Sequence, residues 1–313
     1  MTANHGVVKK LKIISPLGVN RENIMLPNFI IGGASRCGTT TLYHMLSQHP
    51  SIFMPAQKEL LFFYKDDNYN QGQKFYEKNF SLAKAGQMIG EASPPYFHHG
   101  ITVNNEGDHQ WSEDDDSVTR MAGMVPNAKI ILSLRNPIAR VQSQIWKNIW
   151  QGNEKSTSFT ESIMEEVDGQ RNPSDSKLCW MYKNRYSTHI QHWLDHFPRE
   201  NILFLVFEEW TCNPELALRK IESFLGIDPM PFKQEDAAVR NEGRSTRSSI
   251  TKVIMPIARK LPVLRGLYKR VATKRGYPEP DEKIKLLLTE YFDEDIKALE
   301  ALIGEDLSAW RAT

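Results

Sequence analysis

The chain has 313 residues, of which 40% are hydrophobic and 25% charged, so its composition is that of a globular protein and excludes collagen-like, coiled-coil and disordered chains. Its 39 basic and 38 acidic residues leave a formal net charge of +1, which gives the whole molecule no strong electrostatic preference for nucleic acid or membrane. Any anion-binding site must therefore be local.

Cysteine content and the N-terminal sequence bear on the compartment. Cys37, Cys179 and Cys212 are the three cysteines, too few and too irregular for a disulfide framework or a repeated metal-ligand spacing. The first 25 residues lack the continuous apolar stretch of a signal peptide, and no segment approaches the roughly 18 apolar residues that span a bilayer. We therefore expect a soluble, cytoplasmic protein.

Apolar segments that alternate with amphipathic helical patterns predict the elements in chain order. The expected strands are residues 29–31, a weaker segment at 87–91, 129–134 and 201–207. A helix is expected after Gly38, another from Pro137 to about Trp150, and a third that Asn213 caps and Gly226 ends. Residues 186–197 predict a further helix whose aromatic residues face the core.

This alternation predicts an α/β fold of the P-loop type, with three layers and a central parallel sheet flanked by helices. Ligands then bind at the carboxyl ends of the strands, near Gly33, Glu91 and Arg135. We expect a single domain over residues 1–313, with a core at about 27–250. The other expected parts are an acidic surface insertion at about 101–118 and a basic helical C-terminal part at about 248–313.

Residues 33–40, with the sequence GASRCGTT, have the G-x-x-x-x-G spacing of a phosphate-binding loop between a strand and a helix. Gly33 and Gly38 let the backbone curl so that N–H groups face a phosphate, and Thr39 and Thr40 add hydroxyl donors. The alternative is a strand-to-helix turn that binds nothing.

The loop differs from that of a nucleoside triphosphatase, in which a lysine follows the second glycine. Here Thr39 takes that position, and Arg36 is the nearest cation. No apolar strand ends in an obvious magnesium-binding aspartate. The loop is thus suited to an anion without a metal, which argues against the alternative of a small-molecule kinase.

Arg135 follows the second strong strand, where its guanidinium can clamp a phosphate. Ser143 lies about two helical turns further on and can add a hydroxyl, and Arg140 is a further cation on that helix. The alternatives are a buried ion pair of Arg135 with Glu91 or Glu208, and an ordinary surface charge at Arg140.

Taken together, these residues resemble the sulfotransferases that use 3′-phosphoadenosine 5′-phosphosulfate. The loop of that family reads Lys-x-Gly-Thr-Thr, matched by residues 36–40, and its 3′-phosphate motif runs from an arginine to a serine eight residues later, matched by Arg135 and Ser143. The similarity extends from about residue 29 to 247. Residues 58–63 (KELLFF) resemble the Glu-x-x-Phe-Phe segment of the heparan-sulfate-type and bacterial branch.

The resemblance implies transfer of a sulfuryl group from 3′-phosphoadenosine 5′-phosphosulfate to a hydroxyl or amine, with adenosine 3′,5′-bisphosphate as product and no metal requirement. It implies that Glu59 is the general base and that Arg36 stabilises the leaving phosphate. The implied donor-binding residues are Arg36, Cys37, Gly38, Thr39, Thr40, Thr41, Arg135, Ser143, Gly243 and Arg244. Arg36 stands where the family has lysine, and Ala92 where some glycosaminoglycan enzymes carry one.

Other assignments stay open at this point. Glu59 can instead be a solvated partner of Lys58 or Lys65, with Glu91 as the reserve base. His98 and His99 suit a loop at the acceptor entrance or a base, because histidine titrates near pH ~6.5. A nucleophilic Cys37 is a further alternative.

The partner is expected to be a glycan, lipid or small-molecule acceptor, and not nucleic acid. The acidic residues between Glu106 and Asp116 favour a neutral or weakly charged acceptor if they border the cleft. Residues 243–278 carry many arginines and lysines and no acidic residue, so they can contact a membrane surface peripherally or form a non-catalytic anion-binding module.

Overall fold

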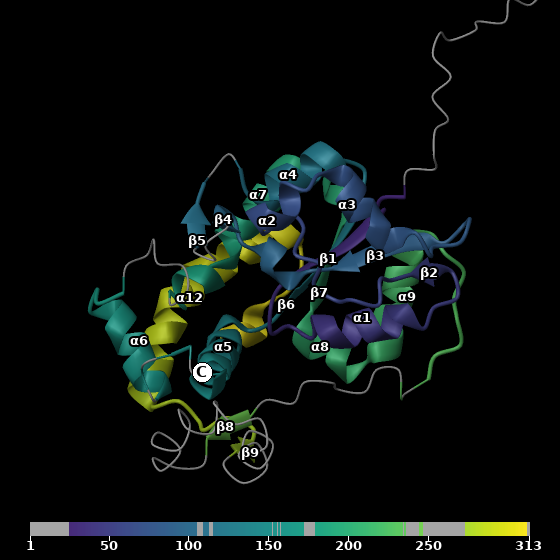
Figure 1. Cartoon of the computed structure of the whole chain (residues 1–313). Helices are drawn as coiled ribbons and strands as arrows, with labels where there is room; N and C mark the ends of the chain where they lie inside the picture. Colours follow the sequence, from purple (N-terminus) through teal and green to yellow (C-terminus); the bar gives the residue numbers. More distant parts are fainter. Residues whose placement is uncertain are drawn as a thin grey trace, which may run out of the picture.

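A computed structural model describes residues 25–104, 109–112, 115–151, 153–154, 156, 158–171, 179–233, 235, 244–246 and 273–311. At its centre is a five-stranded sheet in the order β2-β3-β1-β6-β7, and all four neighbouring pairs are parallel (Figure 1). The strands are β1 (Phe29–Gly33), β2 (Ile52–Phe53), β3 (Met88–Ala92), β6 (Lys129–Leu134) and β7 (Ile202–Val206). The predicted α/β fold with a parallel central sheet is confirmed.

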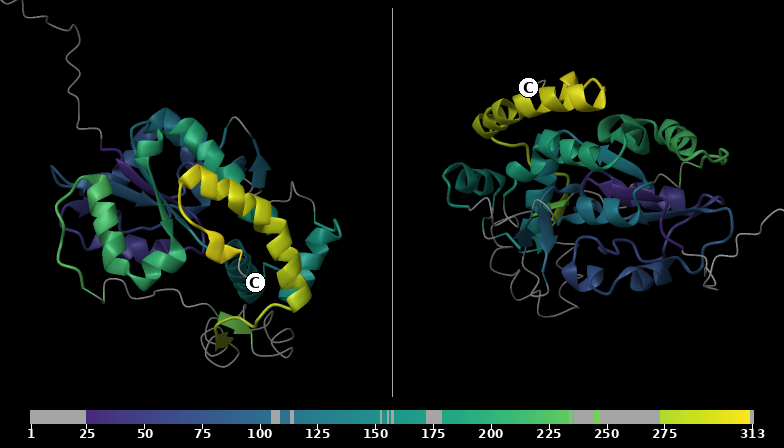
Figure 2. Two further views of the ribbon diagram at one scale, coloured as in Figure 1. Left: turned by 180° about the vertical axis from the view of Figure 1, so that it is seen from behind. Right: turned by 90° about the horizontal axis from the view of Figure 1, so that it is seen from above.

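One face of the sheet presents Ile30, Ile130 and Leu132 to a hydrophobic core. The helices that complete this core are α4 (Ser117–Met124), α5 (Pro137–Gln151), α7 (Tyr186–His196) and α12 (Glu282–Ile303). Helix α12 lies outermost and packs along α7, as the two views of Figure 2 show. Buried Asp295 of α12 accepts the backbone N–H of Tyr186 at 2.7 Å and so caps α7.

The other face presents the neighbouring residues of the same strands, Phe29, Ile31 and Ile131, because successive side chains of a strand point to opposite sides. Its covering helices are α1 (Thr39–Ser47), α8 (Phe207–Cys212) and α9 (Pro214–Leu225). Two helical layers with the sheet between them give the predicted three-layer arrangement.

Shorter elements connect these layers. They are α2 (Asp66–Tyr69), α3 (Gln73–Glu77), α6 (Phe159–Val167), β4 (Ile101–Val103), β5 (His109–Trp111), β8 (Arg244–Thr246), β9 (Thr273–Arg275) and the 3₁₀ helices η1 (Lys78–Phe80), η2 (Pro94–Phe97), η3 (Tyr182–Asn184), η4 (Arg199–Asn201) and η6 (Ser308–Trp310). Strands β4 and β5 pair antiparallel, as do β8 and β9. None of the described helices is long and apolar enough to cross a membrane.

The expected helix boundaries follow their local signals closely. Pro137 begins α5, and the side chain of Asn136 accepts the N–H groups of Ile138 and Ala139 at 3.0 and 3.2 Å. Asn213 caps α9 in the same way, and Gly226 ends it in the left-handed conformation. The last strand stops one residue earlier than expected, because Phe207 already begins α8.

The structure qualifies the expectation of an acidic surface insertion at 101–118, because Ile101 is buried and Asp116 is fully buried as the N-cap of α4. The C-terminal part, expected to be basic and helical, contains α12, which carries six acidic residues and three lysines. Residues 247–272 of the basic stretch lie outside the described residues.

Candidate active site

The glycine loop joins β1 to α1 as the sequence predicts. Gly38 adopts a left-handed φ of 77°, and a Cβ there would lie 2.3 Å from the ring of Trp210. A side chain at this position is therefore excluded both by backbone conformation and by space. No side chain caps α1, so the N–H groups of its first turn are oriented as an anion site requires.

Ser133 of β6 fastens this loop to the sheet. Its backbone oxygen accepts the N–H of Ala34 at 2.8 Å, and its hydroxyl donates to the backbone oxygen of Cys37 at 2.7 Å. The same hydroxyl accepts the indole N–H of Trp210 at 2.9 Å. A polar residue inside a buried strand is thereby satisfied, and the loop is held from two sides.

Arg36 and Ser143, predicted to bind opposite ends of the donor, are in direct contact. Arg36 Nε donates to Ser143 Oγ at 2.8 Å, and its Nη2 donates to the hydroxyl of Tyr277 at 3.2 Å. The Tyr277 hydroxyl is also 3.1 Å from Ser143 Oγ. Arg36 has a left-handed φ of 72°, a costly conformation for a residue with a side chain and one that is common at functional loops.

Arg135 lies beside this cluster at the carboxyl end of β6. Its Nη1 donates to the backbone oxygen of Arg36 at 3.4 Å, and its guanidinium stacks 4.8 Å from the centre of the Phe207 ring. In the described part of the chain it forms no ion pair with Glu91 or Glu208, and its buried Nε has no hydrogen-bond partner. An unsatisfied buried donor at this point fits an anion.

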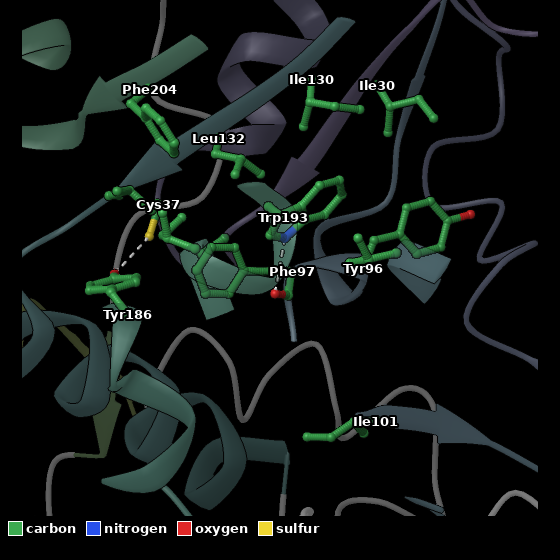
Figure 3. Close-up of a cluster of buried hydrophobic side chains, with 14 of the residues drawn as sticks. Ile30, Cys37, Tyr96, Phe97, Ile101, Ile130, Leu132, Tyr186, Trp193 and Phe204 are labelled. Carbon is green, nitrogen blue, oxygen red and sulfur yellow. Dashed lines mark hydrogen bonds between the residues drawn. The ribbon is translucent and has the colours of Figure 1, made fainter. Parts of the chain in front are cut away.

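Arg140 is fully buried, so the alternative of a surface charge is wrong. Its Nε donates to the backbone oxygen of Ser35 at 3.0 Å, and its Nη1 reaches the backbone oxygen of Lys183 and the side chain of Asn184. The guanidinium also lies over the ring of Phe97, which Figure 3 shows in the core beside Tyr186 and Trp193. Arg140 therefore stabilises the glycine loop through its hydrogen bond to Ser35.

Glu59 lies where its segment crosses the end of β3, since its N–H donates to the backbone oxygen of Ala92 at 3.0 Å. Its side chain is 48% exposed and forms an ion pair with Lys58 at 2.6 Å. Glu59 also has a left-handed φ, of 63°. The aromatic pair that follows it is buried as expected, and Phe62 stacks on Tyr76 with ring centres 4.2 Å apart.

Lys147 of α5, which no sequence motif singles out, belongs to the same neighbourhood. Partial desolvation and the charges of Arg36 and Lys58 lower the pKa of its ammonium, and the carboxylate of Glu59 opposes that shift. Lys147 thus lies within electrostatic reach of two cations, Arg36 and Lys58, and of one anion, Glu59. Ala92, whose backbone oxygen accepts the N–H of Glu59, ends β3.

Glu91, the reserve base, is engaged elsewhere. It is 1% exposed and accepts hydrogen bonds from the hydroxyls of Ser93, Tyr76 and Tyr96. Burial raises the pKa of Glu91, although these hydroxyls oppose the shift. Glu91 therefore has a structural role in the core next to η2.

The histidines after η2 do not line an open entrance, as one expectation had it. His98 is buried, and its ring lies against those of Phe97 and His189. The ring of His99 stacks on His192 of α7. Both residues therefore face α7.

The remaining predicted donor-binding residues differ in what the structure shows of them. Thr39 and Thr41 are buried in the first turn of α1, and Thr40 is partly exposed. Gly243 lies outside the described residues, and Arg244 is described as the first residue of β8. Strand β8 lies against α5, on which Ser143 is found.

Cys37 points into the core, 3.8 Å from the hydroxyl of Tyr186 (Figure 3). Burial raises the pKa of its thiol, and the nearby charges of Arg140 and Arg135 only partly oppose this. A protonated thiol without access to solvent is a poor nucleophile, so the structure gives no support to catalysis by Cys37.

We expect iodoacetamide to label the native protein at exposed Cys212 and to leave buried Cys37 unmodified. Peptide mapping by mass spectrometry measures this, with the urea-unfolded chain as the fully labelled control and Cys212→Ser to remove the fast site. Rapid labelling of Cys37 in the native protein would contradict the burial of its thiol.

A three-layer parallel α/β fold with a glycine loop at the start of a helix defines a phosphate-binding protein of the P-loop class. The model of the Sulfotransferase family matches residues 27–231, about two thirds of the chain. The chain belongs to the sulfotransferase family.

Similar proteins agree with this assignment. The chain is 27% identical over 297 residues to bifunctional heparan sulfate N-deacetylase/N-sulfotransferase 2 of Bos taurus. This match covers 91% of the chain but 30% of that protein. It is 27% identical over 205 residues to heparan sulfate glucosamine 3-O-sulfotransferase 5 of Homo sapiens, covering 65% of the chain and 54% of that protein. The chain thus spans a third to about half of the length of these two relatives.

A solved structure supports the fold. The sulfotransferase from Alicyclobacillus acidocaldarius has a TM-score of 0.66 and 26% sequence identity, and the match covers 92% of this chain and all of that one.

Proposed function

We propose that this protein transfers a sulfuryl group from 3′-phosphoadenosine 5′-phosphosulfate to a hydroxyl or amine of an acceptor. One observation carries the proposal: the loop cation Arg36 contacts Ser143 and, through its backbone oxygen, Arg135. Residues suited to two separate phosphates thus form one continuous cluster, as a donor with a phosphate on each side of its ribose requires.

The residues present fit such a donor. The curled backbone at Gly38 leaves no room for a side chain, and the buried Nε of Arg135 has no partner within the described residues. The loop N–H groups and Arg36 would hold the 5′ side, while Arg135 and Ser143 would hold the 3′-phosphate. When bound, the donor supplies the sulfuryl group.

The chain contributes positioning and charge to the transfer. Arg36 and the loop N–H groups stabilise the charge that grows on the leaving oxygen, because donors fixed in place need no reorganisation. Glu59 accepts the proton of the acceptor group. Its exposed carboxylate and its position beyond the end of β3 support this role.

The acceptor side combines one carboxylate with Lys58 and Lys147. The acidic segment gives less reason than expected for a neutral acceptor, since Asp115 is paired with Arg120 and Asp116 is buried. We favour a polar acceptor such as a glycan, and the heparan sulfate named in two relatives places glycans first among the classes to screen.

Donor choice tests the proposal. Adenosine 3′,5′-bisphosphate should bind in the presence of EDTA and should bind about one to two decades more tightly than ADP, because each charge-assisted contact to the 3′-phosphate contributes roughly 1.5–3 kcal/mol. Isothermal titration calorimetry measures both affinities. Equal affinity for ADP, or an absolute need for magnesium, would favour a kinase instead.

A further inference from the structure

Three buried or half-buried side chains from separate segments converge beside α7. They are His99, which follows η2, Asp116, which caps α4, and His192 on α7, and we refer to them as the His99–Asp116–His192 cluster. One potential ligand atom from each lies within 4.8 Å of the other two. Asp116 is fully buried and His192 is 8% exposed.

The geometry of His192 suggests more than an ion pair. Its Nε2 is 2.9 Å from Asp116 Oδ2, yet within the described residues this buried nitrogen has no hydrogen-bond partner of acceptable geometry. The N–H or lone pair of an imidazole nitrogen lies in the ring plane, so the carboxylate oxygen is close but off that direction. Two atoms in this relation are placed like neighbouring ligands of one ion.

Asp116 is held ready as an anionic ligand. Its Oδ1 accepts the N–H groups of Val118 and Thr119 at 2.9 and 3.0 Å, and its Oδ2 accepts that of Gly100 at 2.8 Å. Three backbone N–H groups thus fix the orientation of the carboxylate, with one lone pair of Oδ2 left for an ion, as outer hydrogen bonds fix ligands in metal sites.

His99 completes the cluster from its more accessible side. Its ring stacks on that of His192, with centres 4.1 Å apart and planes inclined by 27°. Neutral imidazole nitrogens bind metals, and the stacking brings two such rings side by side. His99 is only partly buried.

We propose that the His99–Asp116–His192 cluster binds a divalent transition-metal ion, foremost Zn²⁺. Two imidazoles and one carboxylate are a common zinc ligand set, with a fourth position open to water. Tetrahedral bonds of about 2.0–2.1 Å place ligand atoms roughly 3.3 Å apart, so small ring rotations suffice to close the cluster. The proposal is independent of the proposed sulfuryl transfer.

Such an ion would have a structural role. It would join the turn after η2 to the start of α4 and the middle of α7. Phe97 of η2 packs against Gly33, where an added Cβ would lie 2.5 Å from that of Phe97. Metal binding to the native state but not to the unfolded chain would therefore stabilise η2, against which Gly33 of the glycine loop packs.

Zinc binding to the full-length protein tests the proposal. After dialysis against EDTA and its removal, titration calorimetry with zinc chloride should show one tight site, and zinc should raise the melting temperature. His99→Ala should weaken binding by about 100-fold or more, because loss of an outer partner alone costs 10- to 100-fold. Since His99 is partly exposed, this variant should fold, which its melting temperature without zinc verifies.

His196→Ala is the matched control. Its ring centre is 4.4 Å from that of His192, but it is not one of the three ligands. This variant should retain the zinc site. With Co²⁺ in place of zinc, His196→Ala and the wild type should show the visible absorption of a tetrahedral complex, and His99→Ala should not. The proposal is overturned if wild type shows no tight site, if His99→Ala keeps it, or if His196→Ala loses it equally.

Discussion

Glu59→Gln should lower turnover by about 10²- to 10⁴-fold while affinity for adenosine 3′,5′-bisphosphate stays nearly unchanged. Glutamine keeps the size of the side chain but cannot accept a proton. The loss should appear in turnover because the contacts described for Glu59, its backbone bond to Ala92 and its ion pair with Lys58, do not involve the predicted phosphate-binding side chains. Steady-state kinetics with an active acceptor and calorimetry with the product nucleotide measure the two effects.

Lys58→Gln is the control for this variant. It breaks the same ion pair with Glu59 but leaves the carboxylate in place, so turnover should fall by no more than about tenfold, as expected for an exposed pair. If Glu59→Gln keeps near-normal turnover, Glu59 is not the base. The proposed sulfuryl transfer would survive that result.

Arg140→Ala should cause the largest loss of stability among the arginine variants near the loop. It removes the hydrogen bonds that a fully buried guanidinium donates to the backbone oxygens of Ser35 and Lys183 and to the side chain of Asn184. Hydrogen bonds of charged groups contribute about 1.5–3 kcal/mol each, so the free energy of unfolding should fall by at least about 3 kcal/mol. Urea denaturation measures this change.

Arg135→Ala is the paired variant, with the opposite expected pattern. Its guanidinium makes one long hydrogen bond, to the backbone oxygen of Arg36, and a ring contact with Phe207, so its loss should change stability less. Affinity for adenosine 3′,5′-bisphosphate should fall by about one to two decades. Unchanged nucleotide affinity in this variant would refute the assignment of Arg135 to the 3′-phosphate.

Local signals in the sequence were sufficient for four of the five strands of the central sheet, β1, β3, β6 and β7, and for the helices α1, α5, α7 and α9, but not for β2 or α4. Uninterrupted apolar runs marked β1, β6 and β7, and the caps Asn136 and Asn213 lie within a few residues of what they cap. The glycine loop was recognisable for the same reason, since spacing, strand and helix are contiguous. The proximity of Arg36, Arg135 and Ser143 followed from the rule that parallel strands end at one edge.

Residues that complete the site through distant contacts were not predictable in this way. Trp210 lies 172 positions after Gly38 and Tyr277 follows later still, yet both contact the loop. Neither residue belongs to a sequence motif that would indicate this contact. Lys147 is one polar residue among several on α5, and its relation to Glu59 depends on how α5 packs. The burial of Asp116 depends likewise on Gly100 and His192, which no local pattern connects to an acidic run.

The hydrogen bonds that Ser133 makes to Ala34, Cys37 and Trp210 have a consequence for the thermodynamics of binding. They fix the backbone of the glycine loop in its curled form, so a ligand meets a preorganised cradle and binding costs little conformational entropy for ordering the loop. Weakening this fastening, for instance by Ser133→Ala, would therefore reduce nucleotide affinity through added loop disorder, although Ser133 itself need not touch the ligand.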